Sequence, residues 1–482
     1  MFDGMDSEES CGDIFNYGIN DDHLKLIHEA NREVVINVKT PTGLSKSYKI
    51  THRTMQGDTW APIQASAQVD SFGKEMILEK PSFMFKFKGE VPIPLLGQVD
   101  DLLGVSEVGF KTEQLNAFVN VKTADKDLQF GSDKCQYMIV SKMKLQNFLK
   151  PELFVDSWHL EHTENGEIKE ELVGKVPMEE KESLMYLGYM LSQSASNMPN
   201  ISHKQHKAIG TQKQIPKLIE PLGVYRFESA FIYTEALLRS SILYGAETMC
   251  NVKEYEYRAF EKIEEAVFQK IYSTTRSCSR HLMYLEGGMA PARFQVMRQM
   301  LCRLQYILQE PADSLQNRMY QAQRNSPTKG DWASETNKIL KIFDISIPLQ
   351  DIKNMKQTKF KYLVKKQMLN VAFRNLIEKQ QNGKKGKMIH YETLQISDYL
   401  LPECSLSVSD KFELFAYRTE MNDLPNNFGR DDICEMGCLE AMDNSHLLLC
   451  SGLNHNDPHE LKYEQLLNGN INEKVAVLKK LQ

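Results

Sequence analysis

Residues 95–106, LLGQVDDLLGVS, place two adjacent acids, Asp100 and Asp101, between two apolar runs. A carboxylate buried in such surroundings costs free energy unless a partner compensates it. The pattern therefore predicts a strand, an Asp-Asp turn and a second strand within residues 91–106. Aspartate is a common turn residue, and carboxylates are also the ligands that Mg²⁺ combines with substrate phosphates. The acids are either a solvated turn or the end of a metal-binding hairpin.

Composition limits the class of protein. The 482 residues are 41% hydrophobic and 25% charged, which is typical of a soluble protein of about two to four domains. With a net charge of −6, any nucleic-acid surface has to be a local basic patch. Nine scattered cysteines indicate reduced thiols, so we expect a location in the cytoplasm or nucleus. The acidic start and the lack of a long apolar run predict neither a signal peptide nor a membrane span.

The first 195 residues predict mixed helix and strand structure. Apolar residues recur there at helical or alternating spacing between turn residues. The expected elements are a helix capped by Asn20 or Asp21, a hairpin around residues 41–43, a helix over 62–76 with Pro62 in its first turn, a helix over 113–130, a strand at 136–142, a polar hairpin over 158–175 turning at Asn165-Gly166, and a strand over 184–192.

From about residue 200 the pattern changes to amphipathic helices. Long helices are expected over 227–249, 254–275 and 291–309, and weaker ones over 333–343 and 361–380. A glycine-containing linker at 381–387 precedes a cysteine-bearing tail. The fold class is therefore α+β, with a mixed region followed by an all-helical one.

Three further blocks accompany the acidic hairpin in a fixed order: MQGDTWAPIQAS at 55–66, LQFGSDKCQYMIV at 128–140 and MYLGYMLS at 185–192. With the hairpin, they resemble the second to fifth palm motifs of a reverse transcriptase of the non-LTR retrotransposon kind. The resemblance implies an RNA-directed DNA polymerase, a nucleotidyltransferase that uses an RNA template, a DNA primer and deoxynucleoside triphosphates. It also implies that residues 1–195 form a palm-like antiparallel sheet backed by helices.

The resemblance assigns roles to particular residues. Asp100 would hold Mg²⁺ or Mn²⁺, with Asp101 and Lys134 as its catalytic neighbours and Lys134 near the incoming triphosphate. Gln56 and Gly57 would contact template or nucleotide, and the turn of Tyr186, Leu187 and Gly188 would support the primer end. Each position also has an ordinary interpretation: a loop-to-helix junction at 56–57, a surface lysine at 134, and a core strand at 186–188.

Two departures from the family pattern concern the metal site. The family's first palm block resembles D-x-x-K-x-F-D, and Phe2-Asp3 match only its end. Its metal-binding aspartate would then precede residue 1. In addition, Gln98 stands where an aromatic is usual. We therefore expect a truncated polymerase that is inactive alone, or one that takes the missing palm strand from a second chain.

Residues 196–325 resemble the helical thumb-like region of these retroelement proteins. SSILYGAETM at 240–249 matches an L-L-Y-G-x-E-x-W block, with Met249 in place of tryptophan. Arg293, Arg298 and Arg303 share a helix that could lie along a duplex backbone. A solvated face of a packed bundle explains these arginines equally well.

Residues 326–390 form a basic connector. Aromatic Phe360 and Tyr362 interleave with a run of lysines: Lys353, Lys356, Lys359, Lys361, Lys365 and Lys366. Lysines neutralise phosphates and aromatics stack on bases, so the segment is a candidate nucleic-acid contact. An exposed helix face would have the same composition.

The tail, residues 391–482, contains the spacing C-x3-C-x7-H-x3-C. Its candidate ligands are Cys434, Cys438, His446 and Cys450. Three sulfurs and one imidazole suit a closed, structural Zn²⁺ site of the zinc-knuckle kind; reduced side chains in a small apolar tail are the alternative. With the basic connector, this tail supports a second functional hypothesis, a non-catalytic nucleic-acid-binding protein.

Overall fold

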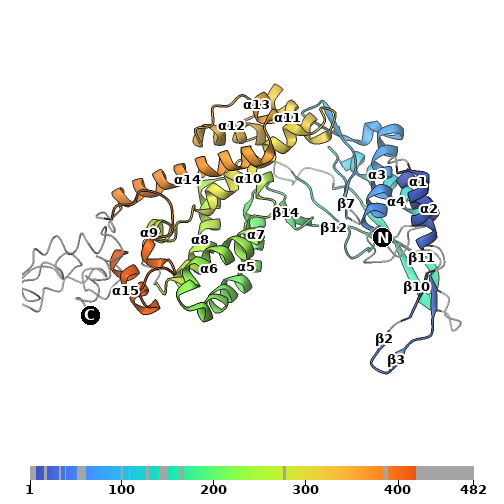
Figure 1. Cartoon of the computed structure of the whole chain (residues 1–482). Coiled ribbons are helices and arrows are strands. Elements are labelled where there is room, and N and C mark those ends of the chain that lie inside the picture. The colour runs from blue at the N-terminus through green and yellow to red at the C-terminus, as the bar shows by residue number, and fades with distance from the viewer. Residues whose placement is uncertain are drawn as a thin grey trace, which may run out of the picture. The chain divides into compact units, whose positions relative to one another are not determined.

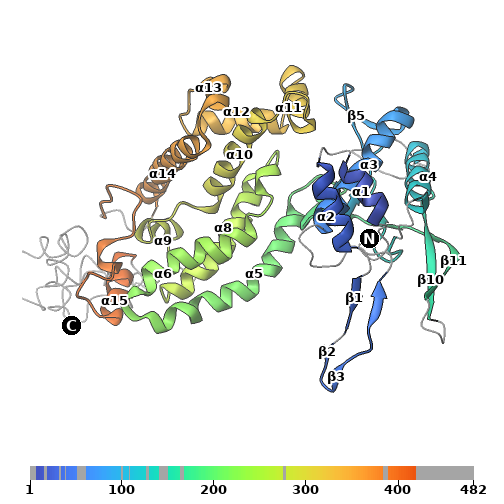
Figure 2. The same ribbon diagram turned by 45° about the vertical axis from the view of Figure 1, so that its right-hand side comes forward.

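The computed structural model describes residues 7–15, 19–31, 34–37, 39–50, 61–98, 101–107, 109–125, 130–140, 150–162, 168–274, 278–383 and 389–419. The chain folds as two units, Met1–Pro199 and Asn200–Gln482. Unit 1 combines helices with short strands, whereas the described part of unit 2 is helical (Figures 1 and 2). The predicted α+β class is confirmed at this level.

Unit 1 contains four α-helices among its described residues: α1 (Ser7–Phe15), α2 (Asp21–Asn31), α3 (Ala61–Glu79) and α4 (Gly109–Asp125). Its strands are β1 (Val34–Ile36), β2 (Lys39–Thr40), β3 (Gly43–Leu44), β4 (Tyr48–Ile50), β5 (Phe85–Phe87), β6 (Val91–Ile93), β7 (Leu96–Gln98), β8 (Asp101–Leu103), β9 (Gln136–Tyr137), β10 (Phe154–His162), β11 (Ile168–Pro177), β12 (Glu179–Glu180), β13 (Ser183–Tyr186) and β14 (Tyr189–Ser192).

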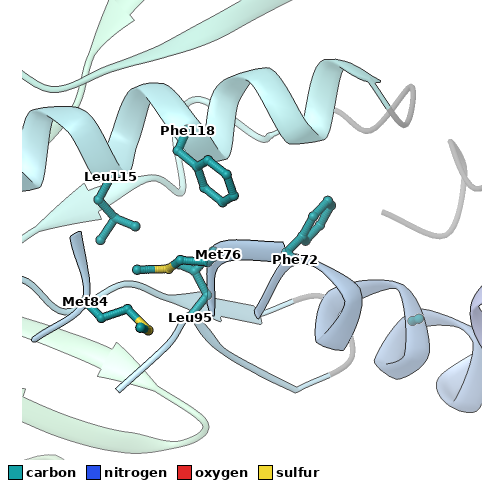
Figure 3. Close-up of a cluster of buried hydrophobic side chains, with 7 residues drawn as sticks. Phe72, Met76, Met84, Leu95, Leu115 and Phe118 are labelled. Carbon is teal, nitrogen blue, oxygen red and sulfur yellow. The ribbon is translucent and has the colours of Figure 1, made fainter. Parts of the chain in front are cut away.

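The described strands form seven two-stranded ladders. The pairs β1–β4, β2–β3, β5–β6, β7–β8, β10–β11 and β13–β14 are antiparallel, and β9–β12 is parallel. Helices α3 and α4 supply most of the buried apolar side chains of one core cluster. Their side chains meet those of the β7 region in one cluster (Figure 3): Ala65, Phe72, Met76, Met84, Leu95, Leu115 and Phe118.

Most sequence predictions for unit 1 are confirmed. Asn20 caps α2, because its Oδ1 accepts a hydrogen bond from the His23 amide at 3.1 Å. Pro62 lies in the first turn of α3. The predicted hairpins correspond to β1–β4 with β2–β3, to β7–β8 and to β10–β11, although the Asn165-Gly166 turn lies outside the described residues. The predicted helix at 113–130 is α4, and the strand at 136–142 shortens to the two residues of β9.

Unit 2 contains the helices α5 (Met198–Ile219, which begins just before the boundary), α6 (Arg226–Tyr233), α7 (Ser240–Ile242), α8 (Glu254–Ile271), α9 (Arg280–Glu286), α10 (Ala292–Gln309), α11 (Leu315–Asn325), α12 (Trp332–Ile342), α13 (Leu349–Asn354), α14 (Gln357–Asn382) and α15 (Val408–Arg418). The predicted helices around α8, α10, α12 and α14 are confirmed. Helices α5, α9, α11, α13 and α15 were not predicted.

The prediction of one continuous helix over 227–249 is wrong. The chain leaves α6 through a π-helical turn at Thr234–Arg239, continues as α7 and stops after Ile242. Gly245 then adopts φ 71°, a left-handed conformation that ends the helix. The hydrophobic period alone does not register such a change of winding.

Two buried carboxylates organise unit 2. Glu264 of α8 and Arg239 are both almost fully buried, and their Oε1 and Nε atoms lie 2.6 Å apart. The second Glu264 oxygen accepts hydrogen bonds from the Tyr284 hydroxyl at 2.8 Å and the Ala292 amide at 2.9 Å. One carboxylate therefore holds the chain before α7 together with α9 and the start of α10.

Glu286, at the end of α9, repeats the arrangement. Its carboxylate accepts from Arg418 Nε at 2.8 Å, from the Ser397 hydroxyl at 2.6 Å and from the Tyr391 hydroxyl. The backbone also pairs here, because the Ser397 amide donates to the Glu286 carbonyl at 2.9 Å. The described part of the tail is thus packed onto the helical unit.

Replacing Glu264 by alanine removes the buried partner of Arg239 and leaves this buried guanidinium with the more exposed Glu235 as its counter-charge. We expect the free energy of unfolding of unit 2 to fall by about 3–5 kcal/mol. Glu254→Ala is the control, because that side chain is 74% exposed and its ion pair with Arg293 is worth at most about 1 kcal/mol. Denaturant unfolding followed by circular dichroism measures both variants, and equal losses would contradict the assignment.

Candidate functional site

The acidic stretch forms the predicted hairpin. β7 and β8 pair antiparallel in the register Leu96↔Leu103, Gly97↔Leu102 and Gln98↔Asp101, which leaves only residues 99 and 100 between the paired ends. Asp101 is exposed, whereas Leu95 just before β7 is buried. Asp100 itself lies outside the described residues. The carboxylate of Asp101 therefore avoids the desolvation cost that the apolar flanks suggest.

Two glycines allow the hairpin to lie directly on helices. A Cβ atom at Gly97 would come within 1.7 Å of Val69 Cγ1 on α3, and one at Gly104 within 2.9 Å of Leu115 Cδ2 on α4. Neither position has room for a side chain. Neither glycine was predicted to be important, although each lies three residues from the acid pair, one on either side.

The Tyr186-Leu187-Gly188 block forms a second hairpin, β13–β14, so the prediction of a single strand over 184–192 is wrong. Tyr186 pairs with Tyr189, and the two residues between them have positive φ, 49° at Leu187 and 75° at Gly188. Two consecutive positive φ values define the tight hairpin turns that match strand twist. Leucine rarely adopts this conformation, so the residue type at 187 does not indicate the turn, whereas the motif resemblance does.

The electrostatics of Tyr186 link the two predicted turns. Burial raises the pKa of the Tyr186 hydroxyl, and the negative charge of Asp101 raises this pKa further. The end of the acidic hairpin therefore lies within electrostatic reach of the Tyr186 turn, far along the sequence. Tyr186 is only half-buried, so its ring lies at the edge of this region.

Lys134 is exposed in a turn in which its amide donates to the Gly131 carbonyl at 2.9 Å. Within the described residues, no hydrogen bond or ion pair joins its side chain to Asp101. The remaining predicted site residues lie outside the described part of the chain: Gln56, Gly57, Asp100, Cys434, Cys438, His446 and Cys450.

Asp101 is the described residue that suits the metal implied by the resemblance. An exposed carboxylate at the end of a hairpin is a hard oxygen donor, and Mg²⁺ commonly uses one or two carboxylates together with substrate phosphates. In the part of the chain that the structure covers, no group of three or more His, Cys, Asp or Glu side chains could hold a metal ion by itself.

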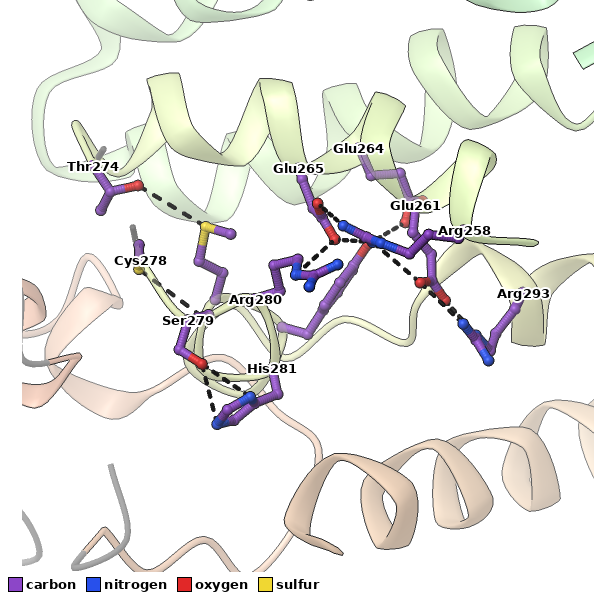
Figure 4. A network of polar contacts seen from close by, with 12 residues as sticks. Arg258, Glu261, Glu264, Glu265, Thr274, Cys278, Ser279, Arg280, His281 and Arg293 are labelled. Atoms are coloured by element: carbon purple, nitrogen blue, oxygen red, sulfur yellow. Dashed lines mark hydrogen bonds and ion pairs between the residues drawn. The ribbon is translucent and has the colours of Figure 1, made fainter. Parts of the chain in front are cut away.

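The predicted basic residues of unit 2 separate into paired and unpaired groups. Arg293 is bound within the fold: it donates to Glu261 of α8, as Figure 4 shows, and to Glu254 at 2.7 and 3.1 Å. Phe360, proposed for base stacking, is fully buried, so that interpretation is wrong for this ring. Tyr362 is 69% exposed, and the six lysines of the connector are all exposed.

Comparison with known proteins adds no family. No protein-family model matches the chain, and no curated protein matches it either. Among the described helices, none combines the length and apolar content needed to cross a bilayer. The reverse-transcriptase resemblance therefore depends on the four motif blocks and on how the chain arranges them.

Gly97→Ala tests the contact between the acidic hairpin and helix α3. The added methyl overlaps Val69, so we expect the free energy of unfolding of unit 1 to fall by about 1–3 kcal/mol. In Gly97→Ala/Val69→Ala the overlap disappears, and the double variant should lose less than the sum of the single losses. Gly12→Ala, in α1 with no atom within 4 Å of the new methyl, should instead stabilise the unit by about 0.5–1 kcal/mol. Thermal unfolding of all four variants decides, and a neutral Gly97→Ala would contradict the contact.

Proposed function

We propose that unit 1 is the palm of an RNA-directed DNA polymerase of the reverse-transcriptase type, and that the chain derives from a retrotransposon. The observation that carries this proposal is that two of the four motif blocks form tight antiparallel hairpins, β7–β8 at the acid pair and β13–β14 at the Tyr186 turn. The charge of Asp101 also raises the pKa of Tyr186, which supports a single site for both turns. In a palm these two turns serve one site, because metal-bound phosphates and the primer end have to meet there.

The chemistry assigned to the site follows from charge. Asp100 and Asp101 would hold Mg²⁺ or Mn²⁺, which supplies activation of the primer hydroxyl and stabilisation of the leaving pyrophosphate. Lys134 would neutralise the triphosphate. Gln56 and Gly57 would let template or nucleotide approach the backbone at the start of α3.

The proposal has two forms, because Mg²⁺ demands near-ideal octahedral geometry. In one form, the chain completes the metal shell with its own groups and polymerises alone. In the other, a second chain contributes a carboxylate from a further palm strand. Both forms require the acid pair for binding of the metal together with its nucleotide.

Binding of Mn²⁺ in the presence of a deoxynucleoside triphosphate tests the palm assignment. We expect Asp100→Ala to weaken this binding at least about tenfold, since a direct ligand is lost. Glu107→Ala removes another exposed acid of unit 1 and should leave binding unchanged. Calorimetric titration measures the Mn²⁺ affinity of all three proteins. Equal affinity of wild type and Asp100→Ala would refute the assignment of unit 1 as a palm.

Primer extension on an RNA template then separates the two forms. Extension by the wild-type chain that Asp100→Ala abolishes means that the chain polymerises alone. Asp100-dependent Mn²⁺ binding without extension means that a second palm strand is required.

A second candidate function is non-catalytic nucleic-acid binding through the basic connector and the tail. The observation that favours it is that all six connector lysines are exposed at α13 and α14: Lys353, Lys356, Lys359, Lys361, Lys365 and Lys366. Salt-dependent binding of nucleic acid that persists in Asp100→Ala would support this function.

The proposed zinc site of the tail has its own test. We expect about one Zn²⁺ per purified chain, because three thiolates and one imidazole complete a tetrahedral shell. Cys434→Ser should lower the zinc content several-fold and destabilise the tail, whereas Cys250→Ser, at an exposed cysteine of unit 2, should not. Elemental analysis with thiol titration measures both, and wild-type protein without zinc would reject the site.

A further inference from the structure

Unit 2 contains a groove between α10 and α14. The two helices pack against each other and lie side by side in both views (Figures 1 and 2). The groove has a volume of about 660 Å³. Its lining comes from both helices and from the turn before α8: Glu247, Arg298, Gln299, Cys302, Arg303, Gln305, Tyr306, Gln357, Lys361, Tyr362 and Lys365.

Four cations converge on this groove. Arg298 and Arg303 come from α10, and Lys361 and Lys365 come from α14. Among the residues that the structure describes, none of the four forms an ion pair with a carboxylate. Glu247 is the one acid among the lining residues, so the groove is locally cationic in a chain of net charge −6.

The charges from the two helices act on the same place. Burial raises the pKa of the Cys302 thiol, while Arg298 and Lys361 both lower it. A guanidinium from α10 and an ammonium from α14 therefore flank one side chain at the groove wall. An anionic chain that crosses the groove would meet cations from both sides.

The groove also offers flat surfaces. Tyr306 is 42% exposed and Tyr362 is 69% exposed. The Arg303 guanidinium lies 4.7 Å from the centroid of the Tyr306 ring, which forms an arginine–tyrosine stack. Such rings and guanidinium planes are the surfaces on which unpaired bases stack. Tyr306 was not among the predicted nucleic-acid contacts. It could have been predicted to lie beside Arg303, because residues three apart on a helix are neighbours.

We propose that this groove binds single-stranded nucleic acid, with phosphates on the four cations and a base on Tyr362. Paired bases in a duplex are stacked on each other and offer a tyrosine no face, so the aromatic component selects unpaired strands. The inference rests on the second candidate function, which it locates, and it is independent of the polymerase proposal.

Binding of fluorescein-labelled oligo(U) and oligo(dT) to the full chain tests the groove. Fluorescence anisotropy in EDTA at several KCl concentrations keeps any palm metal out of the measurement. We expect Tyr362→Ala to bind about fivefold to a hundredfold more weakly, and Tyr362→Phe to bind like wild type. Arg298→Gln/Lys361→Gln should reduce the slope of log affinity against log salt by about 1.4, which is two phosphate contacts.

Two matched controls keep the test specific. Lys262→Gln/Lys270→Gln removes the same charge from α8 at exposed positions outside the groove, and should leave the slope within about 0.5 of wild type. Tyr255→Ala removes another exposed tyrosine of unit 2 and should leave affinity unchanged. Circular dichroism confirms that each variant is folded.

The outcomes distinguish binding in the groove from binding elsewhere and from recognition of charge alone. If the control lysine pair reduces the slope as much as the groove pair, nucleic acid binds unit 2 outside the groove; the groove is then refuted while the second candidate function stands. Equal competition by a duplex of the same length, or by poly-glutamate at equal charge, also overturns the proposal, because phosphate or charge alone is then recognised. Tighter binding of oligo(U) than of oligo(dT) would support the groove and identify RNA as the occupant.

Discussion

The backbone of β7 lies directly on helix α3 at Gly97, and the geometry of unit 1 depends on this contact. A side chain at Gly97 would overlap Val69, so the close approach is open only to glycine. The approach lets Leu95 enter the cluster that joins α3 to α4. The stem of the hairpin is held in an apolar layer, while Asp101 at its end is exposed to solvent. Hydrophobic packing thereby positions a charged group without burying it.

In unit 2, a buried ion pair fixes the position of a helix. Glu264 accepts from Arg239, from a tyrosine hydroxyl and from the amide of Ala292, the first residue of α10. Burying an ion pair costs desolvation that only several good hydrogen bonds offset. Such a pair tolerates few alternative packings, so it fixes where α10 begins. The groove residues Arg298 and Arg303 follow from that start on the same helix.

The sequence predicted features that depend on near neighbours. Turn residues and alternation identified the acidic hairpin, and strong helical period identified α8 and α10. Helix α5 was not predicted because three of its buried apolar positions, Ile201, Ala208 and Ile215, lie seven residues, or about two helical turns, apart. Apolar residues are therefore too sparse along this face to form a continuous stripe. The pairing of Arg293 with glutamates of α8 was missed because the partners come from another helix. The sequence could identify candidate cations, but not which of them folding neutralises.

That last difference bears on nucleic-acid binding. Three arginines of α10 and six connector lysines looked equivalent in the sequence, yet only a cation without an internal partner can exchange its counterions for phosphates. Arg293 is neutralised by Glu254 and Glu261, and the ring of Phe360 is buried in the core. Packing α10 on α14 places four cations without an internal carboxylate partner among the described residues, and the exposed ring of Tyr362, along one groove. The nucleic-acid surface that we propose for unit 2 is therefore limited to residues that neither the core nor the internal ion pairs use, and it is smaller than the basic composition suggests.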